Sequence, residues 1–85
     1  MDSQEVFDVV NICVRKAAMV DMDDDELTPE CDLMDEGFVD SLGLVSIIIQ
    51  IETNYNIKFT DGDIAQPRMA TIKGLAEMIS EKLGL

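Results

Sequence analysis

The chain has 85 residues, and its 18 acidic against 6 basic side chains give a formal net charge of -12. This length predicts a single domain, residues 1–85, and an apolar content of 47% argues against a disordered chain despite the charge. Nucleic acid is excluded as a partner because its recognition requires a basic surface, and an anionic membrane surface is disfavoured for the same reason. The chain has no histidine, which excludes every catalytic mechanism that needs an imidazole base.

The first predicted helix has Ser3 as its expected N-cap. Cys13 lies on the apolar face of this helix and is expected to be a buried free thiol, and Cys31 is expected to be an unpaired thiol in a loop. The residues before the helix lack the basic start and apolar core of a signal peptide, and no apolar run is long enough to span a membrane. We therefore expect a cytoplasmic protein without membrane insertion. The apolar stripe of the helix consists of Val6, Val10, Cys13, Val14 and Ala17.

A long connection, residues 19–40, follows this helix and contains ten acidic residues and no basic residue. A structureless loop of this length is unusual in so small a domain, so local structure and contacts with the core are expected. Thr28, Pro29 and Glu30 have the N-cap, first-position and early-acid chemistry that favours a single helical turn. The side chains expected to hold the connection against the core are Leu33, Met34, Phe38 and Val39.

The acidic residues of this connection raise the question of a calcium site. The spacing of Asp21, Asp23 and Asp25 matches the first ligands of an EF-hand loop. The sixth position of such a loop requires glycine for a sharp turn, but Glu26 occupies it, and Asp32 stands where the bidentate glutamate belongs. We therefore expect a solvated acidic loop and predict no metal site.

The most apolar run of the chain belongs to a predicted second helix from about Ser41 to Tyr55. Asn56 is able to take the left-handed conformation that ends a helix. Leu42, Val45 and Ile49 lie to one side of the main apolar stripe, so Ile49 either packs in the core or faces solvent. The main stripe consists of Leu44, Ile47, Ile48, Ile51 and Tyr55.

The remaining chain predicts one short helix and one longer helix. Thr60 caps the short helix over residues 60–65, which Pro67 brings to an end. Thr71 caps the last helix, and Gly84 stops it. Three main helices and one short helix, none stable alone in water, must share one core, so the predicted fold is an all-α four-helix bundle with a long first loop.

Ser41 is the residue around which we predict the function. It lies where the acidic loop becomes the second helix, so its hydroxyl should be exposed beside the free backbone N–H groups of the first helical turn. This end of a helix carries partial positive charge and favours a phosphate, so Ser41 is predicted to bear a phosphate ester rather than to act as a catalytic nucleophile. The alternative is that Asp40 and Ser41 merely cap the helix.

The chain resembles acyl carrier proteins and, more broadly, phosphopantetheine-binding carrier domains. The resemblance depends on Asp40-Ser41-Leu42, on Leu33 and Gly37 before them, and on the order of the helices along nearly the whole chain. It implies an acyl-carrier-like four-helix bundle and a covalent cofactor, 4'-phosphopantetheine, attached to Ser41 by a transferase. The arm's thiol would carry acyl or aminoacyl intermediates as thioesters, and the protein itself would be neither an enzyme nor in need of a catalytic residue.

The resemblance also implies the partners. These are a phosphopantetheinyl transferase and an acyl- or aminoacyl-adenylating ligase, synthase or transferase of lipid or secondary-metabolite biosynthesis, acting on a monomeric phosphoprotein.

Carriers of fatty-acid synthesis usually have glycine three residues before the serine, whereas Gly37 precedes Ser41 by four, and Ser46 and Thr53 stand where those carriers often have acids. This pattern looks more like stand-alone carriers served by an adenylating ligase, such as D-alanyl or amino-acid carriers. We expect partners to contact Leu42, Val45 and Ile49 more than charged residues. The alternative function is an unmodified acidic interaction module with the same fold.

Overall fold

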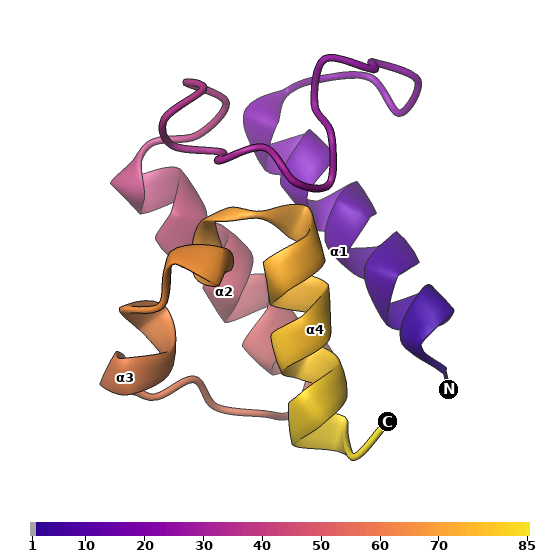
Figure 1. Cartoon of the computed structure of the whole chain (residues 1–85), viewed down its shortest axis with the longest axis vertical. Helices are drawn as coiled ribbons and strands as arrows, with labels where there is room; N and C mark the ends of the chain where they lie inside the picture. Colours follow the sequence, from indigo (N-terminus) through magenta and orange to yellow (C-terminus); the bar gives the residue numbers. More distant parts are fainter. Residues whose placement is uncertain (1) are drawn as a thin grey trace.

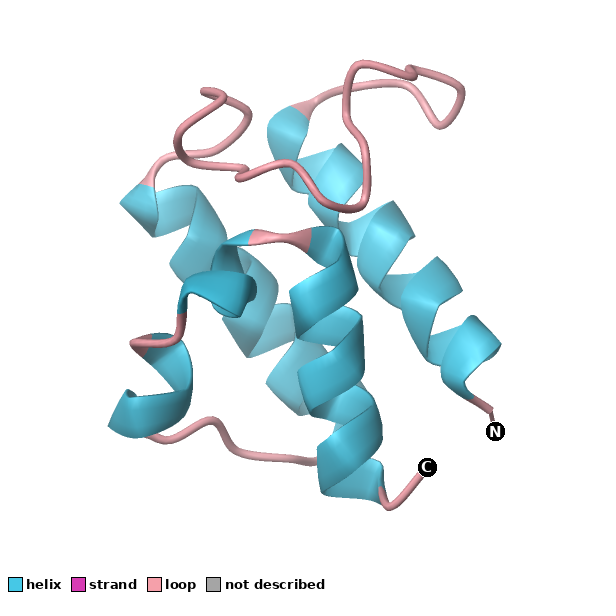
Figure 2. Ribbon diagram, viewed as in Figure 1, coloured by secondary structure: helices cyan, strands magenta, loops and turns pink. Residues whose placement is uncertain are grey.

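The computed structural model describes residues 2–85, and this range is helical without any strand (Figure 2). The elements are α1 (Ser3–Ala18), α2 (Ser41–Tyr55), α3 (Asp61–Ile64), the 3-10 helix η1 (Pro67–Ala70) and α4 (Ile72–Leu83). The predicted all-α fold, with three main helices, a short one and a long first loop, is confirmed. The second helix has the predicted bounds, whereas η1 was not predicted.

Side-chain caps explain where the helices begin and end. Asp40, Thr60 and Thr71 each accept a hydrogen bond from a backbone N–H in the first turn of the helix that follows. The prediction that Ser3 caps α1 is wrong by one residue, because the carboxylate of Asp2 accepts the N–H of Glu5 at 2.9 Å and Ser3 is already helical. The three longer helices all end on a residue in the left-handed conformation: Met19, Asn56 and Gly84.

The core lies where α1 contacts both α2 and α4 (Figure 1). Each helix contributes a stripe of aliphatic side chains that are removed from water, and burying one such side chain contributes about 1.5–3 kcal/mol. The shared core therefore supplies the stability that no single helix has. Its fully buried members from these three helices include Val6, Val10, Val14, Ile47, Ile51, Ile72, Leu75 and Ile79.

Tyr55, at the end of α2, has its hydroxyl enclosed without a hydrogen-bond partner among the described residues. Its ring packs against the core, as the predicted stripe required. Burial raises the pKa of this phenol above its ordinary value, and the neighbouring Cys13 and Glu5 raise it further.

The long connection is held to the core. One hydrogen-bonded turn begins at Thr28, as predicted, because the Thr28 carbonyl accepts the N–H of Cys31 at 3.3 Å. A second turn begins at Asp32, whose carboxylate accepts the N–H groups of Met34 and Asp35 at 3.0 and 2.9 Å. Leu33 and Val39 are buried and Phe38 is partly buried, as predicted. The prediction for Met34 is wrong, because its side chain is 41% exposed. Leu27, which was not predicted, is fully buried.

Arg15 organises the first half of this connection from inside the protein. Its guanidinium donates to the backbone carbonyls of Asp21 and Asp24, each at 2.7 Å, and to that of Leu27 at 3.0 Å. A further hydrogen bond of 2.9 Å reaches Asn11 on α1. No ion pair between Arg15 and a carboxylate is found within residues 2–85. The acidic segment therefore folds around a buried cation that its carbonyls solvate, and no carboxylate pairs with that cation.

The short helix α3 buries none of its residues, so polar contacts position it. Asp63 completes a capping box with Thr60, and the same carboxylate oxygen pairs with Lys82 of α4 at 2.7 Å. The Lys82 ammonium also lies 5.5 Å from the ring centre of Phe59. Arg68 of η1 makes a two-pronged hydrogen bond with Glu81 of α4 at 2.9 and 3.0 Å.

Candidate functional site

Ser41 is the first residue of α2, and it is exposed. The start of α2 lies at the end of the molecule that carries the long connection, away from both termini (Figure 1). A group attached to the hydroxyl would therefore extend into solvent without displacing any part of the core.

The residues before Ser41 fix the direction in which the chain enters α2. Gly37 has φ +80°, a conformation that glycine takes without strain, and it reverses the chain before the helix. The N–H groups of Phe38 and Val39 both donate to the carbonyl of Leu33, at 2.9 and 3.1 Å. Because Val39 is buried, the approach to Ser41 is anchored on its core side.

Asp40 is the N-cap of α2. Its carboxylate accepts the N–H of Gly43 at 2.7 Å, and its carbonyl accepts the N–H of Leu44 at 3.0 Å. The bond to Gly43 satisfies one of the orphan donors of the first turn, and the bond to Leu44 is the first i→i−4 bond of the helix. The N–H groups of Ser41 and Leu42 lack an intrahelical acceptor by geometry. The end of the helix thus retains donors and partial positive charge next to the hydroxyl.

This arrangement fits a phosphodiester better than a catalytic nucleophile. Within residues 2–85 the Ser41 hydroxyl has no side-chain hydrogen-bond partner, and the chain has no histidine to serve as its base. A phosphate on Ser41 would lie against the helix N-terminus, which stabilises its charge. Asp40 is the nearest acid in sequence that could help to hold a divalent cation during phosphate transfer.

The exposed face of α2 next to Ser41 carries no charge. Leu42, Val45 and Ile49 are 79%, 49% and 55% exposed, so the alternative that Ile49 packs in the core is wrong. The single charged residue of the helix, Glu52, is partly buried and accepts the N–H of Phe59 at 2.9 Å. Glu52 therefore ties α2 to the segment that leads into α3.

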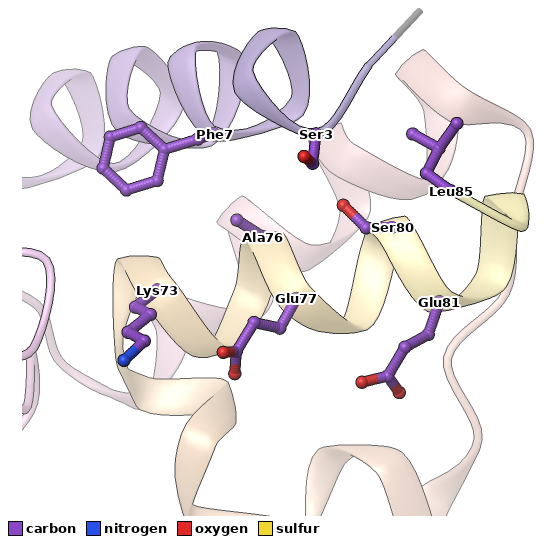
Figure 3. A pocket seen from close by; sticks show the side chains of 8 residues that line it. All are labelled: Ser3, Phe7, Lys73, Ala76, Glu77, Ser80, Glu81 and Leu85. Carbon is purple, nitrogen blue, oxygen red and sulfur yellow. The ribbon is translucent and has the colours of Figure 1, made fainter.

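A surface hollow between α1 and α4 lies outside this site (Figure 3). It has a volume of about 450 Å3, and Phe7 of α1 and Ala76 of α4 contribute to its apolar part. No residue of α2 lines it. Elsewhere in residues 2–85, no three acidic or cysteine side chains converge as a metal site would require, and no helix is long and apolar enough to cross a membrane.

Comparison with known proteins identifies the class to which this fold and this site belong. Residues 9–84 match the family described as "Phosphopantetheine attachment site", and the chain belongs to this family. It is 31% identical over 83 residues to an acyl carrier protein from a Picosynechococcus species, with 96% of each chain covered. It is 28% identical over 81 residues to an acyl carrier protein from Thermotoga maritima, with 95% of each covered. It is also 28% identical over 68 residues to "Polyketide-8 synthase acyl carrier protein 2" from Streptomyces avermitilis, covering 80% of this chain and 76% of that protein.

The protein is accordingly a carrier and not an enzyme. It takes 4'-phosphopantetheine as a covalent prosthetic group and bears acyl groups as thioesters of that group. The thiol at the end of the arm supplies the reactive sulfur, so the protein's task is to present the arm to enzymes. This class of function was predicted from the sequence, and its assignment favours the carrier over the unmodified interaction module.

Proposed function

We propose that Ser41 is the residue that carries the 4'-phosphopantetheine arm. The observation that carries the proposal is an exposed hydroxyl at the first position of α2, held there by the Asp40 cap and the buried Val39. Thr60 and Thr71, at the starts of two other helices, accept first-turn N–H groups as N-caps. Ser3 is also exposed at the first position of a helix, but it lies outside residues 9–84, which match the family.

The chemistry of attachment is a phosphoryl transfer catalysed by the partner enzyme. The Ser41 oxygen attacks the phosphorus of coenzyme A that bears the pantetheine, and a new oxygen–phosphorus bond forms. The bond to the second phosphate breaks, adenosine 3',5'-bisphosphate leaves, and the serine proton passes to a base on the transferase. Asp40 would help to hold a magnesium ion that the transferase supplies, and that ion would neutralise charge on the diphosphate.

We further propose that an adenylating ligase loads the arm, which places this chain with the stand-alone carriers. The spacing of Gly37 before Ser41 and the absence of acids on the exposed face of α2 support this subtype. The ligase would activate a carboxylic or amino acid as an acyl adenylate, and the arm's thiolate would displace AMP to give the thioester. Residues 1–85 would act as one monomeric carrier domain in the cytoplasm, where coenzyme A and ATP are supplied.

Intact-mass spectrometry tests the attachment residue. The protein is incubated with coenzyme A, magnesium and a broad-specificity phosphopantetheinyl transferase. We expect one phosphopantetheine adduct on the wild-type chain and none on Ser41→Ala. Ser46→Ala, which removes an exposed hydroxyl one turn further along α2, is the matched control and should be modified like the wild type. An adduct that persists in Ser41→Ala would disprove the assignment.

The ligase proposal has a separate test. Holo-protein is offered to amino-acid- and fatty-acid-activating ligases with ATP, and to a malonyl transferase with malonyl-coenzyme A. Thioester formation with a ligase and not with the transferase is the expected result. Loading by the malonyl transferase alone would instead place the chain with fatty-acid or polyketide carriers.

A further inference from the structure

Leu33 joins two parts of the molecule that are far apart in the sequence. The second half of the long connection passes beside the junction of η1 and α4 before it turns into α2 (Figure 1). Leu33 lies in this part of the connection, and its side chain is fully buried. Its backbone makes hydrogen bonds in two directions, one toward α2 and the other toward η1.

Toward α2, the carbonyl of Leu33 holds the chain that leads to the candidate site. It accepts the N–H groups of Phe38 and Val39 at 2.9 and 3.1 Å. A carbonyl oxygen has two lone pairs, so this acceptor is fully used. Ser41 follows Val39 by two residues, and the residue between them is the N-cap Asp40. The Leu33 carbonyl therefore fixes the direction from which the chain reaches the Ser41 hydroxyl.

Toward η1, the N–H of Leu33 donates to the carbonyl of Ala70 at 2.8 Å. Ala70 is the last residue of η1, which packs tightly on α4. A Cβ atom at Gly74 of α4 would overlap the Arg68 carbonyl, so the two backbones are in close contact. Arg68 also bonds to Glu81 through both of its terminal nitrogens. The bond from Leu33 thus ties the approach to α2 to a closely packed part of the bundle.

Resting on the proposed attachment at Ser41, we infer that Leu33 is a positioning residue for the modification. By joining the approach to α2 to η1, it holds the Ser41 hydroxyl in the orientation that the transferase needs. Leu33 is buried and Ser41 is exposed, so Leu33 acts through Val39 and Asp40 and does not contact the coenzyme. A shift of about 1 Å between reacting groups can lower a rate about a hundredfold. Loss of the Leu33 contacts should therefore slow phosphoryl transfer and leave binding of the carrier unchanged.

The two kinetic constants of the transferase separate positioning from stability. A carrier that is unfolded part of the time has a lower concentration of competent molecules, which raises the apparent KM and leaves kcat at saturation unchanged. A folded carrier with a misdirected hydroxyl keeps its KM and loses kcat, because the defect is felt in the transition state.

The first experiment compares Leu33→Ala with Leu27→Ala at saturating coenzyme A and magnesium. Leu27 is the matched control, because it is a buried leucine of the same connection whose carbonyl bonds to Arg15 and not to the approach to α2. We expect kcat to fall at least about tenfold in Leu33→Ala. Leu33→Met, which conserves volume, should return kcat close to the wild-type value. Leu27→Ala should keep the wild-type kcat and change only the apparent KM.

A second pair of variants removes hydrogen bonds without changing any side chain. Chemical ligation at Cys31 allows the Leu33 N–H to be replaced by an ester oxygen, which deletes the donor to Ala70. The same replacement at Lys73 is the control, because the Lys73 N–H donates to the Pro29 carbonyl at 2.9 Å. That bond also ties the connection to α4, but it does not hold the approach to Ser41. We expect the ester at Leu33 to lower kcat and the ester at Lys73 to keep the wild-type value.

A wild-type kcat in the Leu33 ester would overturn the inference, and so would a wild-type kcat in a folded Leu33→Ala chain. Equal losses of kcat in a variant and its matched control would overturn it as well. Circular dichroism establishes folding, and the ester pair decides if Leu33→Ala does not fold. All of these outcomes leave the attachment at Ser41 intact, whereas a wild-type chain that no transferase modifies would refute the attachment itself.

Discussion

The guanidinium of Arg15 and the backbone carbonyl of Leu27 are joined by a hydrogen bond of 3.0 Å, and both residues are buried. This bond links the end of α1 to a point twelve residues further along the chain. Together with the bonds to Asp21 and Asp24, it fixes the first half of the acidic connection to the Arg15 guanidinium. The Leu27 carbonyl is buried and would lose its Arg15 donor without a replacement from solvent, so Arg15 is important for stability.

We predict that Arg15→Met lowers the free energy of unfolding by about 2–4 kcal/mol, because the buried Leu27 carbonyl and two partly buried carbonyls lose their donor. Urea denaturation followed by circular dichroism measures this change. The adjacent Lys16 is exposed, so Lys16→Met is the matched control and should cost no more than about 0.5 kcal/mol. Equal effects of the two substitutions would refute the role given to Arg15.

Gly74 is a second position at which we expect a substitution to destabilise the protein strongly, here for a steric reason. A Cβ atom at this position would come well inside contact distance of the Arg68 backbone carbonyl, where α4 passes η1. We expect Gly74→Ala to destabilise the protein by about 2 kcal/mol or more. Gly62→Ala is the control, because a Cβ there meets only Thr60 at 3.7 Å, and this substitution should be neutral or stabilising by up to about 1 kcal/mol. Thermal unfolding of both variants decides the matter.

Asp40 has two roles that substitution can separate. Asp40→Asn keeps a side-chain oxygen that can accept the Gly43 N–H, so the free energy of unfolding should change by less than about 0.5 kcal/mol. Asp40→Ala removes this acceptor and should lower the free energy of unfolding by about 1 kcal/mol. The amide is a poorer magnesium ligand than the carboxylate, so modification by the transferase should slow at least about tenfold in Asp40→Asn. Unchanged modification kinetics in this stable variant would restrict Asp40 to capping.

The position of α3 should depend on pH. The pKa of Asp63 lies below its ordinary value, chiefly because Lys82 donates a hydrogen bond to its carboxylate, and the Thr60 N–H adds to the effect. A depressed pKa means that the carboxylate's contribution to stability is present above the unfolded value of about 3.9 and is lost as pH falls through the folded value. Acidification below about pH 4 should therefore release α3 from α4.

Nuclear magnetic resonance can follow that release through the helical chemical shifts of Asp61–Ile64. Asp63→Asn mimics the protonated state, so at neutral pH its α3 shifts should already match those of the acidified wild type. Helical shifts that stay unchanged in Asp63→Asn would show that the ion pair with Lys82 is not what holds α3.

The features predicted from the sequence are those with local causes. Thr60 and Thr71 cap helices through oxygens that reach N–H groups three residues away, and Gly84 ends α4 through its own backbone freedom. The exposed Ser41 follows from the same kind of cause, because the Asp40 cap directly precedes it. The wrong N-cap prediction at Ser3 also has a local cause. Asp2 and Ser3 are adjacent polar residues that can each cap α1, and in the structure it is the Asp2 carboxylate that accepts the Glu5 N–H.

The features that were missed depend on partners far along the chain. Arg15 has an ordinary position near a helix end, and nothing in its neighbourhood indicates that three carbonyls of the next loop will surround it. Leu27 is an isolated apolar residue beside acids, so periodicity gives no sign of its burial. The turn expected at Thr28 is present, but the sequence gives no sign of the backbone hydrogen bonds that join Pro29 to Lys73 and Leu33 to Ala70.

The absorbance of Tyr55 can be used to follow the packing of α2 against α1. Tyr55 is the only tyrosine, and no tryptophan masks its absorbance or emission. Burial raises the pKa of its hydroxyl while the helices are packed together, and the pKa should return to its ordinary value when the helices separate. An alkaline spectrophotometric titration of the unlabelled protein therefore reports directly whether an arm, a cargo or an enzyme loosens the bundle.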